Sequence, residues 1–191
     1  MLKRKDLVMI YTMDIAGKQC DLKLFPVNDD MQIAAFVLFQ EVEMTQLAAK
    51  ELLARAPEFD LIFTAEAKSI PLAYEMARQA GLPNYIVARK VLKVYMEDAL
   101  SINVNSITTN KTQTLYLSRS EADQMRGKRI LIVDDVISTG HSLHSLEELA
   151  TKAGGQIVGR MAVLAEGEAF DRDDIIVLGK LPLFDGDGNP L

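Results

Sequence analysis

Apolar runs of strand length alternate along the chain with stretches in which apolar residues recur at helical spacing. Buried strands are predicted at 61–65, 85–88, 130–133, 156–165 and 175–178, and helices at 40–56, 70–80, 120–125 and after residue 142. Pro57 closes the first of these helices, Gly81 caps the second, and Gly154 ends the last. Strands that alternate with helices in this way predict an α/β fold, a mostly parallel sheet with helices on both faces.

Three further segments lie outside this alternation. Residues 7–25 predict two β-segments around the turn Ala16-Gly17-Lys18, and alternating polar and apolar residues predict a β-ribbon or lid over 101–107 and 112–118. The end of the chain, 185–190, predicts a turn-rich tail. A calcium-binding loop is not predicted there, because the glutamate that such a loop requires is absent. No repeat or linker interrupts the pattern, so the 191 residues predict a single domain.

Composition argues against several classes of protein. Hydrophobic residues make up 49% of the chain and charged residues 25%, which is typical of a folded globular domain. The formal net charge of −6 argues against nucleic acid as a partner, because nucleic-acid surfaces are usually basic. No run of about 18 apolar residues predicts a membrane span. The single cysteine, Cys20, excludes an intrachain disulfide, so we expect a protein of the reducing cytoplasm.

The stretch 130–142 is the most informative part of the chain, because a buried strand there leads into two acids and a small polar turn. In an open parallel sheet, ligands bind at the carboxyl ends of the strands, which is where Asp134 and Asp135 stand. The turn 138–142 offers hydroxyl groups, a glycine and a helix start, which suit a phosphate. The pattern indicates a ribose diol held by carboxylates and a phosphate held by the turn. The alternative is a strand-to-turn junction with solvated acids.

The same stretch resembles the phosphoribosyl-diphosphate (PRPP) binding motif of type I phosphoribosyltransferases. The resemblance implies that the two acids bind the ribose 2′- and 3′-hydroxyls, directly or through water bound to Mg²⁺, and that the turn binds the 5′-phosphate. The residues that it assigns to PRPP are Asp134, Asp135, Val136, Ile137, Ser138, Thr139, Gly140, His141 and Ser142. It also implies the type I fold, with a core over about 40–180 and a small hood from about 1–35 and the C-terminal segment.

A second candidate element is the loop Thr64-Ala-Glu-Ala-Lys-Ser69, which opens a helix. Lys68 is a cation beside the positive end of the helix dipole, an unfavourable place that indicates an anionic ligand. The alternative is a surface lysine. The loop resembles the Glu-Ala-Arg-Gly of adenine phosphoribosyltransferases, which implies that Ala67 contacts the substrate and that Lys68 binds pyrophosphate. Lysine lacks the bidentate fork of arginine.

The third element is Ala88-Arg-Lys-Val-Leu-Lys93, a strand that ends in three cations. It resembles the family's Arg-Lys-x-x-Lys, which reaches pyrophosphate, in part across a dimer interface. The resemblance implies a homodimer in which Arg89, Lys90 and Lys93 neutralise the charge of the leaving group. The alternative is a solvated basic turn.

The lid and the turn bear on the choice of base. Adenine enzymes carry Glu-Tyr in the lid, whereas Ser106-Ile-Thr-Thr109 stands here and is closer to xanthine enzymes. Hypoxanthine-guanine enzymes place an acid where Ser138 stands, so its absence favours the adenine/xanthine branch. The segments 100–106 and 111–115 also resemble the effector domain of the Gram-positive purine repressor.

Two hypotheses follow. The first is a purine phosphoribosyltransferase that converts PRPP and adenine or xanthine to a nucleoside 5′-monophosphate and pyrophosphate, with Mg²⁺ as cofactor. Lys68, Arg89, Lys90 and Lys93 would stabilise the departing pyrophosphate by positioning and charge. The second is a domain that senses PRPP or a nucleotide without turnover.

Overall fold

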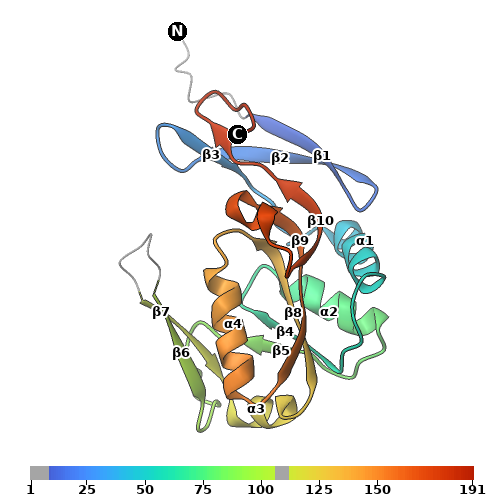
Figure 1. Cartoon of the computed structure of the whole chain (residues 1–191), viewed down its shortest axis with the longest axis vertical. Helices are drawn as coiled ribbons and strands as arrows, with labels where there is room; N and C mark the ends of the chain where they lie inside the picture. Colours follow the sequence, from blue (N-terminus) through green and yellow to red (C-terminus); the bar gives the residue numbers. More distant parts are fainter. Residues whose placement is uncertain (1–8, 106–111) are drawn as a thin grey trace.

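The structure, a computed structural model, describes residues 9–105 and 112–191. Its centre is a parallel five-stranded sheet of order β10-β9-β8-β4-β5 (Figure 1). The strands are β4 (Leu61–Ala65), β5 (Ile86–Ala88), β8 (Arg129–Ile137), β9 (Gln156–Glu166) and β10 (Ile176–Leu181). Each strand overlaps one of the predicted apolar runs, although β8 and β10 extend beyond theirs, and the expected α/β class is confirmed.

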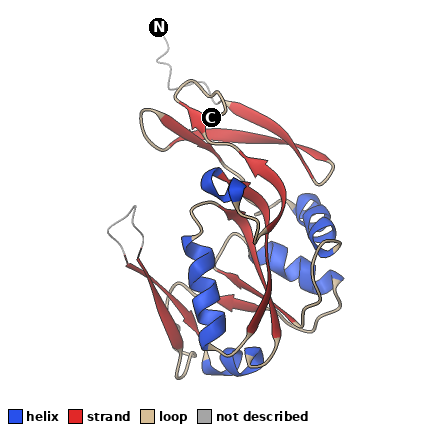
Figure 2. Cartoon of the chain, in the orientation of Figure 1, coloured by secondary structure: helices blue, strands red, loops and turns tan. Residues whose placement is uncertain are grey.

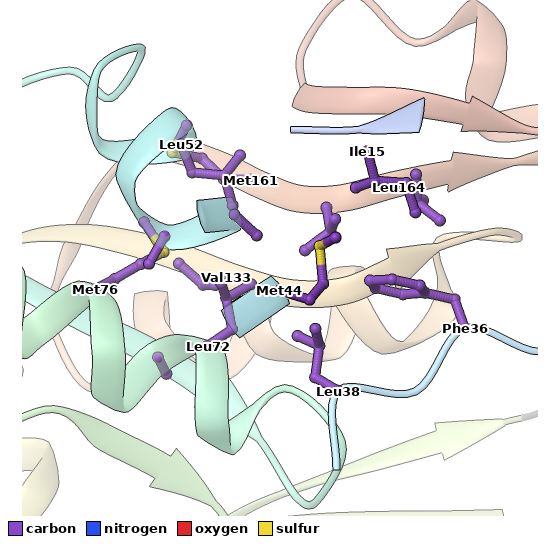
Figure 3. Close-up of a cluster of buried hydrophobic side chains, with 14 of the residues drawn as sticks. Ile15, Phe36, Leu38, Met44, Leu52, Leu72, Met76, Val133, Met161 and Leu164 are labelled. Atoms are coloured by element: carbon purple, nitrogen blue, oxygen red, sulfur yellow. The ribbon is translucent and has the colours of Figure 1, made fainter. Parts of the chain in front are cut away.

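Helices cover both faces of this sheet (Figure 1). They are α1 (Val42–Leu53), α2 (Ile70–Gln79), α3 (Arg119–Met125) and α4 (His141–Lys152). Successive side chains of a strand point to opposite faces, so β8 contributes to two apolar clusters. Leu131 and Val133 pack with α1 and α2, as Figure 3 shows for Val133, whereas Ile130 and Ile132 pack with α4.

The helix boundaries differ from the predictions by a few residues. The first helix is shorter at both ends than the predicted 40–56, and α3 begins at Arg119 instead of residue 120. Ser118 and Glu121 explain the start of α3, because they form a capping box. The Ser118 hydroxyl accepts from the Glu121 amide at 3.3 Å, and the Glu121 carboxylate accepts from the Ser118 amide at 2.9 Å.

A second, antiparallel sheet brings the two ends of the described chain together (Figure 2), and we call it the hood. Its strands, in spatial order, are β1 (Ile10–Ile15), β2 (Lys18–Pro26), β3 (Met31–Ala34) and β11 (Phe184–Asp185). The prediction of two β-segments around residues 16–18 is confirmed, but β3 and β11 were not predicted. Residue 184 holds the supposed tail in place, because Phe184 is fully buried with its ring centroid 4.9 Å from that of Tyr11.

The β-ribbon predicted before α3 is also present. β6 (Leu100–Asn105) pairs antiparallel with β7 (Thr112–Leu117), and Lys152 of α4 donates to the Ser101 carbonyl at 3.0 Å. The lid residues 106–109, on which part of the base argument rested, lie outside the described residues. Within 9–105 and 112–191, no helix is long and apolar enough to cross a membrane.

Candidate functional site

The two acids of the motif lie within β8, not after its end. The prediction ended the strand at residue 133, but β8 stays paired with β9 as far as Ile137, with Asp134 opposite Ala162 and Ile137 opposite Ala165. Ile137 is buried in the cluster around α4, so its predicted proximity to the ligand is through its backbone. Val136 is partly buried and lines the main cavity of the site.

The burial and the charge of the two acids suit the binding of a ligand. Asp135 is only 3% exposed, and its amide donates to Asp134 Oδ1 at 2.9 Å. Burial, and secondly the neighbouring charge of Asp135, raise the pKa of Asp134 above its ordinary value. Asp135 Oδ2 is buried and accepts no hydrogen bond from any described residue, although Lys68 Nζ lies 2.9 Å from it as an ion pair. A buried acceptor of this kind suits a hydroxyl or a cation.

The β4–α2 loop is fixed against β8. The buried Thr64 hydroxyl lies 2.7 Å from the Val133 carbonyl oxygen and 2.8 Å from the Ser69 hydroxyl, which in turn donates to the Ala65 carbonyl at 3.2 Å. The Glu66–Ala67 peptide bond is cis. This arrangement places the exposed Ala67 and Lys68 beside the acid pair, where the sequence had put an anion site.

Glu66 joins this loop to the basic segment. Its carboxylate pairs with Arg89 Nη1 at 2.9 Å and accepts from the Lys90 amide at 2.8 Å. Burial alone would raise the pKa of Glu66, but these hydrogen bonds and the nearby charge of Lys93 hold it below its ordinary value. Arg89 therefore binds the loop in this structure, and of the three cations in the basic segment 89–93, all of them described, Lys90 alone lines the main cavity.

The turn 138–142 opens α4 as predicted. Gly140 has a φ of +77°, in the left-handed region, and caps the helix without a side chain. The Thr139 hydroxyl lies 2.7 Å from His141 Nδ1. A small cavity of about 40 Å³ runs along the turn, lined by Asp134, Val136, Ile137, Ser138, Thr139, Gly140, His141, Ser142 and Leu143. The helix start and the hydroxyls match what a phosphate requires.

A larger cavity of about 510 Å³ joins these elements at the carboxyl edge of the sheet. Predicted residues that line it are Ala67, Lys68, Lys90, Asp134, Asp135, Val136, Ser138 and Ser142. The predicted site residues do not include the segment 33–37, which begins in β3, nor Glu166 and Leu181 at the ends of β9 and β10. Their position at the same edge as the acids was the available signal, because ligands bind at the ends of parallel strands.

Residues 40–179 match the phosphoribosyl transferase domain family. The chain is 32% identical over 114 residues to the purine biosynthesis transcriptional repressor of Bacillus subtilis, an alignment that covers 60% of this chain and 39% of the repressor. It is 31% identical over 153 residues to a hypoxanthine/guanine phosphoribosyltransferase of Methanotorris igneus, covering 79% and 77% of the two chains. A crystal structure of adenine phosphoribosyltransferase from Thermoanaerobacter pseudethanolicus superposes with a TM-score of 0.62 at 25% identity, over 75% of this chain and 84% of that one.

Proposed function

The chain belongs to the phosphoribosyl transferase domain family, and we propose that it is a purine phosphoribosyltransferase, which joins the phosphoribosyl group of PRPP to a purine base. One observation carries the proposal: the acid pair, Lys68 and the turn before α4 meet in adjoining cavities at one edge of the sheet. Its relatives include an enzyme named for hypoxanthine and guanine, and a structural neighbour is named for adenine.

The proposed roles follow from the geometry. Asp134 and Asp135 accept hydrogen bonds from the ribose hydroxyls, and the turn 138–142 binds the 5′-phosphate. Lys68 and Lys90 face the pyrophosphate. A base nitrogen attacks C1′ while the bond from C1′ to the pyrophosphate oxygen breaks, and the proton of that nitrogen passes to solvent. The protein contributes positioning and charge stabilisation, and no covalent nucleophile is needed.

We propose Mg²⁺ as the cofactor. In the described chain, no group of three or more His, Cys, Asp or Glu side chains is placed to hold a metal. Asp134 and Asp135 still suit Mg²⁺, which proteins often bind through one or two carboxylates together with water and substrate phosphates. Asp135 Oδ2, which is buried and accepts no hydrogen bond from a described residue, already pairs with the Lys68 cation, as an oxygen that binds cations would. Bound there, the ion would supply charge neutralisation for the pyrophosphate oxygens.

The proposal is tested by incubating the protein with PRPP, Mg²⁺ and each of adenine, guanine, hypoxanthine and xanthine. We expect at least one base to yield a nucleoside monophosphate and pyrophosphate, and we expect chelation of the metal to stop the reaction. If PRPP binds tightly but no base gives product, the enzyme proposal is wrong.

The second candidate is a domain that binds PRPP without turnover. The similarity to the purine repressor favours it, although the alignment spans less than half of that protein. Both candidates use the acid pair and the turn. The two candidates differ in their need for Lys68. An enzyme needs a cation near the leaving pyrophosphate most when the bond to C1′ breaks, whereas a binding domain breaks no bond.

Lys68→Ala should therefore lower kcat by about 10²–10³-fold while it weakens binding of the nucleotide product, which lacks pyrophosphate, much less. Lys68→Arg keeps the charge and should recover most of the turnover. Lys50→Ala, which removes an exposed lysine in the last turn of α1, is the control. Steady-state kinetics and calorimetry with the nucleoside monophosphate measure the two effects. Equal losses in kcat and in product affinity would contradict the assigned role.

We also propose that the chain forms a homodimer. The segment 91–95, directly after Lys90, exposes several large apolar side chains: Val91 59%, Leu92 51%, Val94 103% and Tyr95 67%. Such a group beside a basic loop suits an interface in which the loop approaches a neighbouring site.

A further inference from the structure

The main cavity has a part that PRPP does not account for. Besides the residues assigned to PRPP, its lining includes the segment 33–37, which begins in β3 of the hood, and Leu181 of β10. Ala34 and Phe36 are buried in the core, whereas Ile33, Ala35 and Val37 are not, and these three offer an apolar surface, as a flat aromatic ring requires. Among apolar walls, a polar side chain that faces the same space determines which edge of a ring fits.

Glu166 is such a side chain. It is the last residue of β9, pairs in register with Leu181 of β10, and lines the cavity. It is partly buried, and no described residue forms a hydrogen bond or an ion pair with its carboxylate. Burial raises the pKa of Glu166, whereas the charge of Lys68 acts in the opposite direction. A partly desolvated carboxylate without a partner is ready to accept hydrogen bonds from a ligand.

The order of the strands places Glu166 where the purine base would bind. β8 and β9 are adjacent, and Ile137 lies opposite Ala165, so the carboxyl ends of the two strands are side by side. If the acids on β8 hold the ribose, the end of β9 and the hood segment 33–37 are left for the ring. The inference therefore rests on the proposed function.

Each purine presents a different pattern of donors and acceptors at its edge. An ionised carboxylate can only accept hydrogen bonds. Guanine offers N1–H beside the N2 amino group, two adjacent donors that match the two carboxylate oxygens, and such bidentate pairs are strong. Adenine offers the N6 amino group beside N1, whose lone pair faces a carboxylate oxygen unfavourably. Hypoxanthine offers only N1–H.

We propose that Glu166 recognises the Watson–Crick edge of the purine base and selects guanine over adenine, with hypoxanthine between them. Glutamine at this position would present one acceptor and one donor, the pattern that complements N6 and N1 of adenine. The proposal thus predicts a change of preference, which a merely structural Glu166 would not produce.

The experiment compares kcat/KM for guanine and adenine, with PRPP and Mg²⁺. We expect Glu166→Gln to lower kcat/KM for guanine by about 10–100-fold and to raise the adenine-to-guanine ratio, with PRPP affinity unchanged. Glu166→Asp keeps two acceptors and should keep the preference for guanine at a lower rate. Glu168→Gln, on the exposed neighbour, is the control.

Failure of this inference is distinguishable from failure of the proposed function. If the wild-type protein turns over a purine and Glu166→Gln leaves the adenine-to-guanine ratio unchanged, Glu166 does not read the base. If no purine is turned over, the proposed function fails, and calorimetry with GMP and AMP replaces the kinetic ratio. Tighter GMP binding that Glu166→Gln abolishes would support recognition by Glu166, and equal binding of the two nucleotides would refute it.

Discussion

Replacement of Gly140 by valine is expected to abolish PRPP binding while the protein remains folded. Gly140 has a φ of +77°, a conformation that β-branched residues adopt only with strain. A Cβ at this position would also lie 2.8 Å from Arg172 Nη1. That guanidinium is the end of a flexible, partly exposed side chain paired with the Asp174 carboxylate at 2.8 and 2.7 Å, so it can move aside, and the backbone strain is the main effect. Because valine disfavours this φ, we expect the turn to shift, so that its amides no longer converge on a phosphate.

Gly127→Val separates this effect from general backbone strain. Gly127 has a similar φ of +71°, but a Cβ there would meet no atom within 4 Å. Both variants should lose stability through strain of roughly 1–2 kcal/mol, and only the Gly140 variant should lose PRPP affinity in calorimetry. Normal PRPP binding by folded Gly140→Val would show that the turn 138–142 is not the phosphate site.

The strands and helices of the core could be predicted because their signal is local. Leu61–Ala65 is apolar except for Thr64 and is buried throughout as β4. The end of β8 could not be read in this way, because Asp134 and Asp135 interrupt the run although the ladder with β9 continues to Ile137. Hydrogen bonding to a neighbouring strand maintained a conformation that side-chain polarity alone did not indicate.

The short strands of the hood could not be predicted, because their signal is not local. β11 has two residues and pairs with β3, which lies about 150 positions earlier in the chain. A pattern of two residues carries no periodicity, and the partner of such a strand is set by tertiary packing, here the burial of Phe184. The prediction of a turn-rich tail therefore missed the strand, although the Asp185 carboxylate does accept from the amides of Asp187 and Asn189 in a turn.

The sequence predicted which charged residues belong to the candidate site, but not which of them pair with one another. The sequence located the acids and the cations, but it gave no reason to expect the Lys68–Asp135 ion pair or the Arg89–Glu66 pair. The argument against a hypoxanthine-guanine enzyme rested on Ser138, the first residue of the turn after β8, where those enzymes carry an acid. Glu166 brings a carboxylate to the same cavity from the adjacent strand, so the absence of an acid at one position does not decide the base.

Replacement of both acids, Asp134→Asn with Asp135→Asn, is expected to weaken PRPP binding at least tenfold. The ribose diol would lose two charge-assisted acceptors, worth roughly 1.5–3 kcal/mol each. Asp29→Asn with Asp30→Asn removes the same charge from two exposed positions in the turn between β2 and β3, and should leave the affinity unchanged. Calorimetry that finds equal PRPP affinity in the wild type and the site variant would overturn the assignment of the acid pair.

The single variant Asp134→Asn should also make the ligand-free protein more stable, because the pKa of Asp134 is raised by burial and by the charge of Asp135. A carboxyl whose pKa is higher in the folded state binds its proton more tightly there. Its contribution to stability is therefore complete below the unfolded value of about 3.9 and is lost as the pH rises through the folded pKa. Asparagine does not ionise, so its advantage over Asp134 should appear only as the pH rises. Thermal melts across this pH range should show the gain at the alkaline end, about 2–4 °C for each kcal/mol relieved. A constant difference at all pH values would mean that Asp134 ionises normally. The acid would then bind the ribose without the electrostatic cost that its position implies.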